Sequence, residues 1–597
     1  MSCLFNSFDP YFKQPFGAVR AGQTVRLSLC IPEELGYVDP HLVLKKEGKF
    51  DVPVYYRMNF NGQTPRQNHF SVEVPLNDPG LYFYYFDLYT DFRRIVRGPD
   101  NCGVISWQDG ESWQITVYEQ DFETPESIKG KVFYQIFPDR FCEGVENKPM
   151  PFADRIYQAD KHAEPFWQPN EVGGHLNEDY FGGDLKGIQQ KLPYLHEMGV
   201  DFIYLNPIFE AHSNHRYNTA DYLNVDPLLG TNEDFEALCT AAQKYGIGIV
   251  LDGVFSHTGS DSRYFNREGR YGEGGAYRDP NSPYRCWYDF GPQYKDGYRS
   301  WWGFETLPEV DEETPSYVEF ITGPGGVIDT WLRRGAAGFR LDVADELPDE
   351  FIEKVRAAVK RVSPEKFLLG EGLDSVMNYP FKNAVLDFVK GKPAEQAMTE
   401  ILTICEHYPA PAMDTALNFL STHDTERALT VIADEPANGR GRAWQSGRCV
   451  TGDAYEEGLL RLRMAYAIIY TLPGVPCLYY GDEIAMQGYR DPFNRAFFRW
   501  DAHEQRLRPV LAQLAQLRHT CEAFRTGQLR VLRAEDGILH YQRVGKVETA
   551  EIIVNRTEHI IVETLASGKS TEVNPMGFTI VVEEVGHNPN HSYYDYV

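Results

Sequence analysis

The chain has 597 residues, more than one compact hydrophobic core can organise, so two to four domains are expected. It is 42% hydrophobic and 24% charged, as in globular proteins, and its net charge of −28 disfavours binding to nucleic acid or to an anionic membrane surface. No apolar run approaches the ~18 residues of a membrane span, and the start lacks a signal-peptide pattern, so we expect a cytoplasmic protein without a membrane partner.

Residues 1–122 are predicted to form an N-terminal β-sandwich. Short alternating runs such as TVRLSLCI and HFSVEVPL are separated by Gly, Pro, Asn and Asp, which is typical of antiparallel strands joined by turns. The ten cysteines of the chain show no CxxC pair and no clustered spacing, so neither a zinc site nor a disulfide framework is predicted.

Residues 130–522 alternate apolar strands with amphipathic helices, which predicts an α/β fold, a (β/α)8 TIM barrel. Its strands are predicted at VFYQIFPDRF, VDFIYLNPIF, GIGIVLDGVF, AAGFRLDVA, KFLLGE, LDSVMNYPF, TALNFLSTHD and GVPCLYYGDE. After the third strand, residues 258–325 form a long excursion rich in Gly, Tyr and Trp, which we interpret as an inserted subdomain. Residues 523–597 return to short strands and predict a small C-terminal β domain.

Acidic and basic side chains stand at the ends of these strands: Asp252, His257, Arg340, Asp342, Glu371, His423 and Asp424. The carboxyl ends of the strands of such a barrel share one face, so several carboxylates are expected in one pocket. Cleavage of a glycosidic bond needs one ionised and one protonated carboxyl group. Aromatic residues are 14% of the chain, including 37 Tyr and 9 Trp, which also suits a neutral, hydroxyl-rich ligand such as a glycan.

Two of the carboxylates have different neighbours. Arg340 lies two residues before Asp342, on the same face of the strand, and its charge is expected to keep Asp342 ionised. Glu371 follows an apolar run without an adjacent Lys or Arg, which favours the role of the protonated acid. Taken singly, Asp252 or Asp424 has a structural explanation as a helix cap; the joint placement favours a site.

Four stretches, LDGVFSHTG, GFRLDVADE, LLGE and FLSTHDTER, resemble in their order the four short conserved stretches of the α-amylase superfamily, glycoside hydrolase family 13. The stretches VFYQIFPDRF, SNHRYNTADY, LPEVDEETP and YYGDEIAMQGYRDPFNR are similar to its neopullulanase, cyclomaltodextrinase and maltogenic amylase branch. The resemblance covers about residues 130–500, and the N-terminal sandwich is similar to the carbohydrate-binding-like extra domain of that branch.

The resemblance implies a role for each matching residue. Asp342 is expected to be the nucleophile, Glu371 the acid/base and Asp424 the carboxylate that stabilises the transition state. The residues implied in substrate binding are Tyr217, Asp252, His257, Arg340, Glu346, His423 and Arg495. The implied reaction is a double displacement with retention of configuration, which needs the carboxyl groups of the nucleophile and the acid ~5–5.5 Å apart.

The predicted function is a retaining α-glucan hydrolase that cleaves α-1,4 bonds, with α-1,6 bonds as further candidates, in maltooligosaccharides, cyclodextrins or pullulan. Two alternatives stay open: a 4-α-glucan transglycosylase that uses the same residues, and a non-catalytic glucan-binding relative. A metal-dependent amidohydrolase barrel is disfavoured, because that class needs an HxH pair on its first strand and YQIFPDRF has none. Besides the glucan, the resemblance allows a homodimer partner, bound through the N-terminal domain.

The sequence departs from the family directly after Glu371. Only Gly372 separates this predicted strand from the next, at LDSVMNYPF, whereas a parallel crossover needs a dozen or more residues. The family also has a Trp soon after the acid, and this sequence does not. Three explanations stay open: a segment absent from this sequence, a true deletion with local rearrangement of the strand, or a degenerate, weakly active relative.

A metal ion is a second point of departure. Ser256 stands where the family usually has an Asn that can serve a calcium site. We therefore predict that no metal or other cofactor is required, with calcium as a candidate only.

Overall fold

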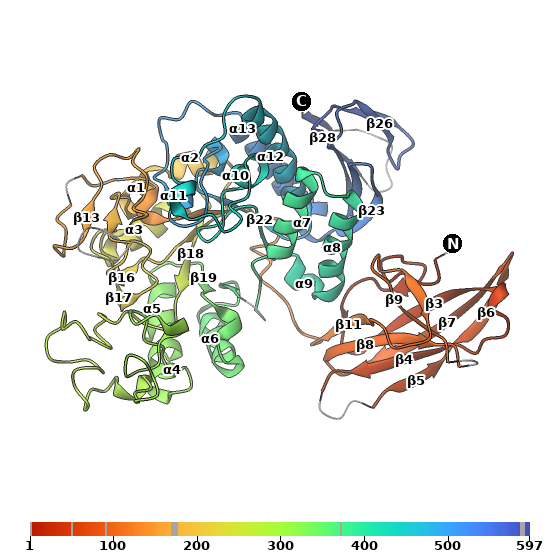
Figure 1. Cartoon of the computed structure of the whole chain (residues 1–597), viewed down its shortest axis with the longest axis horizontal. Helices are drawn as coiled ribbons and strands as arrows, with labels where there is room; N and C mark the ends of the chain where they lie inside the picture. The colour runs from red at the N-terminus through yellow and green to blue at the C-terminus, as the bar shows by residue number, and fades with distance from the viewer. Residues whose placement is uncertain are drawn as a thin grey trace. The chain divides into compact units, whose positions relative to one another are not determined.

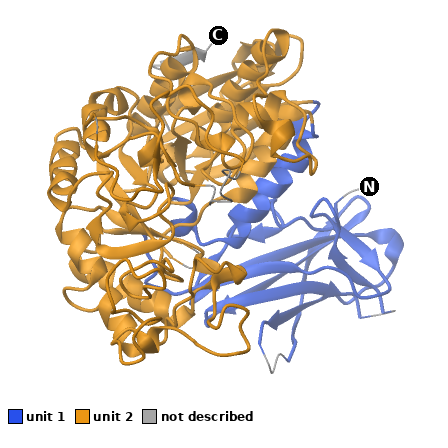
Figure 2. Cartoon of the chain, turned by 60° about the vertical axis from the view of Figure 1, so that its left-hand side comes forward, with its two compact units in different colours: residues 1–124, 392–414, 534–536 blue, residues 125–391, 415–533, 537–597 orange. Residues whose placement is uncertain are grey.

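The computed structural model describes residues 3–48, 52–89, 92–146, 148–168, 177–370 and 373–584, and the backbone of 592–596 (Figure 1). Packing divides the chain into two compact units, blue and orange in Figure 2: residues 1–124, 392–414 and 534–536, and residues 125–391, 415–533 and 537–597. The domain boundaries expected near residues 122, 130 and 522 stay predictions. Among the described helices, none combines the length and the apolar character needed to cross a membrane.

The first unit contains the predicted β-sandwich. One sheet has the strand order β1-β3-β7-β6, and the other has the order β10-β9-β8-β11-β2, with β4 paired to β8 and to β5. The strands are β1 Lys13–Gln14, β2 Val19–Arg20, β3 Gln23–Pro32, β4 His41–Lys46, β5 Val54–Arg57, β6 Asn59–Thr64, β7 Gln67–Leu76, β8 Gly80–Asp87, β9 Arg94–Arg97, β10 Gly103–Ser106 and β11 Trp113–Tyr118. Alternate residues of β3, among them Val25, Leu27 and Leu29, are buried in the core, as expected for strands with one buried face.

Two helices belong to the same unit, α8 (Ala394–His407) and α9 (Ala410–Met413). The Lys13 ammonium lies 2.6 Å from a carboxylate oxygen of Glu406 in α8, and both side chains are almost fully buried. The Ser7 hydroxyl donates to the other oxygen of that carboxylate, at 2.9 Å. This buried ion pair therefore fastens α8 to the first strands of the sandwich.

The second unit contains the predicted parallel barrel. Seven strands form one sheet in the order β20-β19-β18-β15-β12-β22-β21. They are β12 Phe133–Ile136, β15 Phe202–Leu205, β18 Gly248–Gly253, β19 Gly338–Leu341, β20 Phe367–Leu369, β21 Leu417–Phe419 and β22 Val475–Tyr479. Their inward side chains, such as Phe133, Val250 and Leu417, fill the interior. The barrel is thus a packed core whose chemistry must lie at its rim.

A very short eighth strand segment, residues 375–377, closes the barrel. Leu369 pairs in parallel with Ser375, and Met377 pairs in parallel with Leu417, so residues 375–377 join β20 to β21. Backbone hydrogen bonds from Gly370 N to Ser375 O (2.8 Å) and from Leu417 N to Val376 O (2.8 Å) fix this strand segment. The strand predicted at LDSVMNYPF is therefore reduced to residues 375–377, because helix α7 (Tyr379–Lys390) already begins within the predicted stretch.

The buried side chain of Asp374 stabilises this short connection. Its carboxylate accepts hydrogen bonds from the backbone N of Leu368 (3.1 Å) and from Lys360 (2.5 Å) and Arg356 (3.1 Å) of the preceding helix. A buried aspartate with two cationic partners and one backbone donor is well compensated. Of the connection itself, residues 371 and 372 lie outside the described residues.

Helices and small sheets surround the barrel strands. The helices are α1 Leu185–Gln190, α2 Leu192–Glu197, α3 Asn232–Gln243, α4 Pro315–Thr322, α5 Val327–Arg333, α6 Asp349–Val362, α7 Tyr379–Lys390, α10 Ala428–Ala433, α11 Arg442–Gln445, α12 Asp453–Thr471, α13 Leu507–Thr520 and α14 Ala523–Thr526. A capping box of Thr231 and Asp234 starts α3, and α6 buries Phe351, Val355 and Val359 at helical spacing. Two-stranded sheets are formed by β13 Ile156–Tyr157 with β14 Asp179–Tyr180, and by β16 Phe209–Ala211 with β17 Thr219–Val225.

The segment predicted as an inserted subdomain lies between β18 and β19. Between β18 and α4 its described residues form turns and two 3₁₀ turns, Arg285–Trp287 and Trp301–Gly303, rather than longer elements. After the barrel, a sheet in the order β23-β24-β25-β28-β29 confirms the predicted C-terminal β domain. Its strands are β23 Gln528–Glu535, β24 Ile538–Val544, β25 Glu548–Asn555, β28 Gly577–Glu584 and β29 Ser592–Tyr596, beside the pair β26 Ile561–Thr564 and β27 Ser570–Val573.

Candidate active site

One guanidinium joins two carboxylates at the rim of the barrel. Asp252 and Arg340 occupy paired positions on β18 and β19, and Asp342 directly follows β19. Nη1 of Arg340 donates to Oδ1 of Asp252 at 2.9 Å and to Oδ1 of Asp342 at 2.6 Å. The predicted contact between Arg340 and Asp342 is therefore confirmed, and Asp252 shares it.

Burial dominates the ionisation of both acids. It raises the pKa of the Asp342 carboxyl, and the charge of Arg340, which acts to lower that pKa, does not outweigh it. The pKa of Asp252 is raised by burial in the same way. Arg340 thus favours the ionised form of Asp342, as expected from the sequence. The net shift of the Asp342 pKa is nevertheless upward because burial outweighs Arg340, and adjacency along a strand does not reveal burial.

Asp252 is also the acceptor for two tyrosines. Its Oδ2 accepts hydrogen bonds from the hydroxyl of Tyr204 at 2.7 Å and from the hydroxyl of Tyr217 at 2.8 Å. The ring of Tyr217 stacks on the imidazole of His423 with centroids 5.4 Å apart and an interplanar angle of 10°. Asp252 therefore fixes Arg340 and Tyr217 in place, and both of its carboxylate oxygens accept hydrogen bonds from protein side chains.

His423 is held as a neutral imidazole. The side-chain amide of Gln135, on β12, lies 2.8 Å from Nδ1, so Nδ1 is the acceptor and Nε2 carries the proton. That Nε2 faces the hydroxyl of Tyr217 at 2.7 Å and Oδ2 of Asp424 at 3.1 Å. Burial lowers the pKa of His423 to about 4, so the ring is uncharged at neutral pH and can donate from Nε2.

Asp424 is more accessible than Asp252 and Asp342, with half of its side chain exposed. Arg495 approaches its Oδ1 at 3.4 Å with Nη2, and donates from Nε to the backbone oxygen of His423 at 2.9 Å. Burial acts to raise the pKa of Asp424, but it is outweighed by His423, which is protonated in the acidic range where Asp424 titrates, and by the charges of Arg495 and Arg340, so that the pKa is lowered. Asp424 also acts electrostatically on Asp342, which ties it to the same site.

His257 contacts the backbone of Tyr217, whereas His423 contacts its hydroxyl. Its Nε2 lies 3.1 Å from the backbone oxygen of Tyr217 and its Nδ1 lies 2.9 Å from the hydroxyl of Ser256. Burial lowers the pKa of His257 to about 4. The imidazole stacks on the indole of Trp301 at 5.3 Å, with an interplanar angle of 29°.

Glu346 holds two tryptophans of the inserted segment. Its Oε2 accepts from Nε1 of Trp301 at 2.8 Å, and its Oε1 accepts from Nε1 of Trp302 at 2.9 Å. The two indoles are stacked at 5.4 Å, and the side of Trp302 that faces away is open, since this residue is 75% exposed. A row of rings therefore runs from His257 through Trp301 to Trp302 at the surface.

Glu371, the predicted acid/base, lies outside the described residues. The strand that precedes it, β20, pairs with β19 in register from Gly338 with Phe367 to Arg340 with Leu369. β20 therefore ends beside β19, the strand that directly precedes Asp342.

One cationic side chain occupies an oxygen-lined position beside the start of α1. Nζ of Lys148 lies 2.5 Å from Oδ2 of Asp184, 2.7 Å from the backbone oxygen of Gly182 and 3.1 Å from that of Leu228. Within the described ranges, no group of three or more His, Cys, Asp or Glu side chains is arranged to hold a metal ion.

Sequence reasoning found most members of this constellation but missed Gln135, Tyr204 and the Trp301–Trp302 pair. Gln135 and Tyr204 lie inside apolar strands and point to the barrel interior, where a polar side chain needs a partner. An inward polar residue in an otherwise apolar strand could have identified both of them.

Together, a closed parallel barrel and a carboxylate, arginine and histidine network at the carboxyl ends of its strands define an α/β-barrel protein with an acidic site. Residues 135–366 and 357–517 match the family described as "Alpha amylase, catalytic domain". The chain belongs to the alpha-amylase family, and the family predicted from the sequence is confirmed.

Similar proteins agree with this membership. An amylopullulanase from Thermoanaerobacter thermohydrosulfuricus is 33% identical over 617 residues, covering 90% of this chain and 40% of that protein. A cyclomaltodextrinase from Geobacillus thermopakistaniensis is 32% identical, covering 73% of this chain and 70% of that protein. The solved structure of cyclic alpha-maltosyl-(1→6)-maltose hydrolase from Arthrobacter globiformis, in its ligand-free form, has a TM-score of 0.66 at 27% identity, over 77% of this chain and all of that one. The chain spans less than half the length of the amylopullulanases that it matches.

Proposed function

We propose that this chain is a retaining α-glucan hydrolase that acts on maltooligosaccharides, cyclodextrins or pullulan. The observation that carries the proposal is the single guanidinium of Arg340 shared between Asp252 and Asp342, with Asp424 half exposed beside them. Relatives named for cyclomaltodextrin, for pullulan and for a maltosyl-maltose ring support an α-glucan as the substrate class.

In the proposed reaction, Asp342 attacks the anomeric carbon while Glu371 protonates the leaving oxygen, and a glucosyl ester forms on Asp342. Arg340 orients the attacking carboxylate through its 2.6 Å hydrogen bond. Glu371 then takes a proton from water, and the water oxygen displaces Asp342 with overall retention.

The remaining side chains hold the sugar ring. Asp424 accepts from sugar hydroxyls and, as an anion, stabilises the positive charge that develops on the ring. The neutral imidazoles of His257 and His423 complete the hydrogen bonding, because burial prevents them from carrying a competing charge. The face of Tyr217 is the platform beneath the ring.

The replacement Asp342→Asn tests the assignment. It should abolish the release of reducing sugar from maltotriose, since an amide cannot form the ester, while circular dichroism and maltotriose binding stay unchanged. Asp349→Asn, at the exposed start of α6, is the matched control and should retain full turnover. Wild-type rates in Asp342→Asn would refute the role.

A transglycosylase is the second candidate, favoured by the exposed indole of Trp302, which stacks on Trp301, which in turn stacks on His257. Such a surface can bind an acceptor sugar by stacking, and the acceptor hydroxyl then replaces water. Analysis of products at high maltotriose concentration separates the two, because transfer yields chains longer than the substrate and hydrolysis does not.

The short connection after β20 keeps a non-catalytic glucan-binding protein as an alternative. A peptide map of the purified protein over residues 367–381 shows whether this connection is continuous as given in the sequence. Release of reducing sugar that is lost in Glu371→Gln would exclude the non-catalytic alternative.

We further propose that the reaction requires no metal ion. The ammonium of Lys148 already supplies a positive charge to Asp184 and to two backbone oxygens. A homodimer formed through the N-terminal sandwich and a cytoplasmic location remain predictions from the sequence.

A further inference from the structure

The chain between β21 and α10 carries two of the site residues without forming a helix or a strand. In this segment, Nε2 of His423 lies 3.1 Å from Oδ2 of Asp424. Threonine hydroxyls of the segment accept hydrogen bonds from the backbone N–H groups of Thr422 and Asp424. The backbone oxygens of His423 and Thr425 need donors from elsewhere, because neither a helix nor a sheet provides them.

Asn494 supplies these donors from a distant part of the chain. Its Nδ2 lies 2.8 Å from the backbone oxygen of His423, 2.8 Å from that of Thr425 and 3.2 Å from that of Thr422. The residue is fully buried in a short 3₁₀ turn and stands 71 positions after His423. One side-chain amide therefore holds the backbone on both sides of Asp424.

The contact depends on the donor half of this amide. All three neighbours are carbonyl oxygens, so the nitrogen of Asn494 must face them. Its Oδ1 is buried and has no hydrogen-bond partner among the residues that the structure describes. A leucine has nearly the same shape without a donor, and an aspartate would place an oxygen against three oxygens. Position 494 therefore requires a donor rather than a side chain of this volume alone.

The two segments hold each other. Arg427, at the end of the first segment, is fully buried and donates from Nε to the backbone oxygen of Asn494 at 3.1 Å. Arg495, the neighbour of Asn494, donates from Nε to the backbone oxygen of His423 at 2.9 Å. Because Arg495 also approaches Asp424, a displacement of the turn at residue 494 would move this carboxylate and its cationic partner together.

We propose that Asn494 is a positioning residue, whose amide fixes the backbone on both sides of Asp424 so that this carboxylate and His423 face the bound sugar. Its part in the reaction rests on the proposed function, whereas its hold on residues 422–425 does not. Half of the Asp424 side chain is exposed, so the position of its carboxylate depends strongly on its backbone. Misplacing a catalytic group by about 1 Å can cost roughly 100-fold in rate.

The replacement Asn494→Leu tests the role, and Asn555→Leu is its matched control. Asn555 is also fully buried, and its Nδ2 also donates to three backbone oxygens, but in the C-terminal β domain. Asn494→Leu should lower kcat/KM for maltotriose by about 100-fold, mainly through kcat, whereas Asn555→Leu should stay within about twofold of the wild type even where its Tm falls. Should Asn494→Leu not fold, Asn494→Ser, which keeps one donor, should lose about tenfold.

A double-mutant cycle separates positioning from a general loss of stability. In the Asp424→Asn background, the group that Asn494 positions most directly has been removed. The factor lost on adding Asn494→Leu should therefore be at least about tenfold smaller than in the wild-type background. An equal factor in the two backgrounds would show that Asn494 does not act through Asp424 and would overturn the inference.

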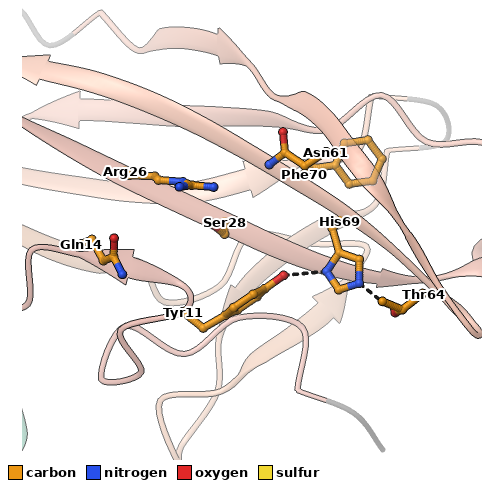
Figure 3. Close-up of a pocket in the computed structure, with 8 residues that line it drawn as sticks. All are labelled: Tyr11, Gln14, Arg26, Ser28, Asn61, Thr64, His69 and Phe70. Carbon is orange, nitrogen blue, oxygen red and sulfur yellow. Dashed lines mark hydrogen bonds between the residues drawn. The ribbon is translucent and has the colours of Figure 1, made fainter.

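Amide hydrogen exchange measures the hold on the segment without catalysis. In Asn494→Leu, peptides that cover residues 422–427 should exchange at least about tenfold faster than in the wild type. Asn555→Leu should leave them unchanged, as should Tyr11→Phe, which removes the hydroxyl that lies 2.6 Å from Nδ1 of His69 in the other compact unit (Figure 3).

The two measurements fail separately. Absence of hydrolysis by the wild type, combined with the expected exchange in Asn494→Leu, would overturn the catalytic proposal and leave the hold of Asn494 on the segment standing. Unchanged exchange in Asn494→Leu, or equal losses of kcat/KM in Asn494→Leu and Asn555→Leu, would overturn the inference.

Discussion

Replacing Arg340 by glutamine tests how the site holds its two buried carboxylates. Arg340 bridges Asp252 and Asp342 at 2.9 Å and 2.6 Å, and its side chain is 11% exposed. Hydrogen bonds to charged groups contribute about 1.5–3 kcal/mol each, and removing one partner of a buried ion pair costs about 3–5 kcal/mol. Arg340→Gln should therefore remove about this much stabilisation from the ionised forms of Asp252 and Asp342, whose pKa values burial already raises.

The loss should appear as a shift in the pH dependence of turnover. One pKa unit corresponds to about 1.4 kcal/mol, so a loss of this size divided between two acids raises the pKa of Asp342 by about one to two units. The nucleophile must be ionised, and the acidic limb of kcat/KM for maltotriose should therefore move to higher pH by the same amount. The measurement is the release of reducing sugar across the acidic and neutral range.

Arg361→Gln is the control for removing a guanidinium elsewhere in the barrel. Arg361 pairs with Asp329 at 2.7 Å, away from the strand ends, and its loss should leave the acidic limb in place. The reasoning is refuted by an acidic limb of Arg340→Gln that coincides with the wild type or moves to lower pH. It is also refuted by an equal shift in Arg361→Gln.

Two further predictions concern stability and metal ions. Glu483 is fully buried beside the hydroxyls of Tyr134 and Tyr194, and burial raises its pKa to about 7, so the native state binds more protons than the unfolded state and stability falls as pH rises from 4.5 to about 7. Glu483→Gln should remove up to about 3 kcal/mol of this pH dependence, seen as a flatter plot of Tm against pH; an unchanged slope would contradict the assignment. For Lys148, we expect EDTA to leave the Tm and activity of the wild type unchanged. Lys148→Ala should lower Tm and recover it partly on addition of Ca²⁺, whereas loss of wild-type activity in EDTA would show that a metal is required.

The sequence alone was sufficient for the barrel, because apolar strands at regular intervals carry a strong periodic signal. The roles of the residues at the strand ends, that of Glu371 among them, stay predictions. The sequence placed Arg340 and Asp342 on one strand face, and the structure confirms their contact. It could not give the pKa of Asp342, because burial depends on the strands and loops that cover the residue. It also missed Gln135, whose partner His423 lies 288 positions along the chain.

The connection after β20 marks another limit of sequence reasoning. Parallel strands ordinarily need a helix between them, and the sequence has no room for one. The structure instead pairs Leu369 with Ser375, and the buried carboxylate of Asp374 accepts hydrogen bonds from Lys360 and from the backbone of Leu368. Lys360 and Arg356, which neutralise that carboxylate, belong to the previous helix and could not be assigned to it from spacing.

Gln135 determines more than its own contact. Its amide decides which nitrogen of His423 carries the proton, and that proton gives the polarity of the relay through Tyr217 to Asp252. A glutamate at this position would present an acceptor, the imidazole would turn its hydrogen toward β12, and the tyrosine hydroxyl and Asp424 would each lose a donor. Exchange at this one position would thus allow the single proton of the Tyr217 hydroxyl to pass to Nε2 of His423 instead of Oδ2 of Asp252.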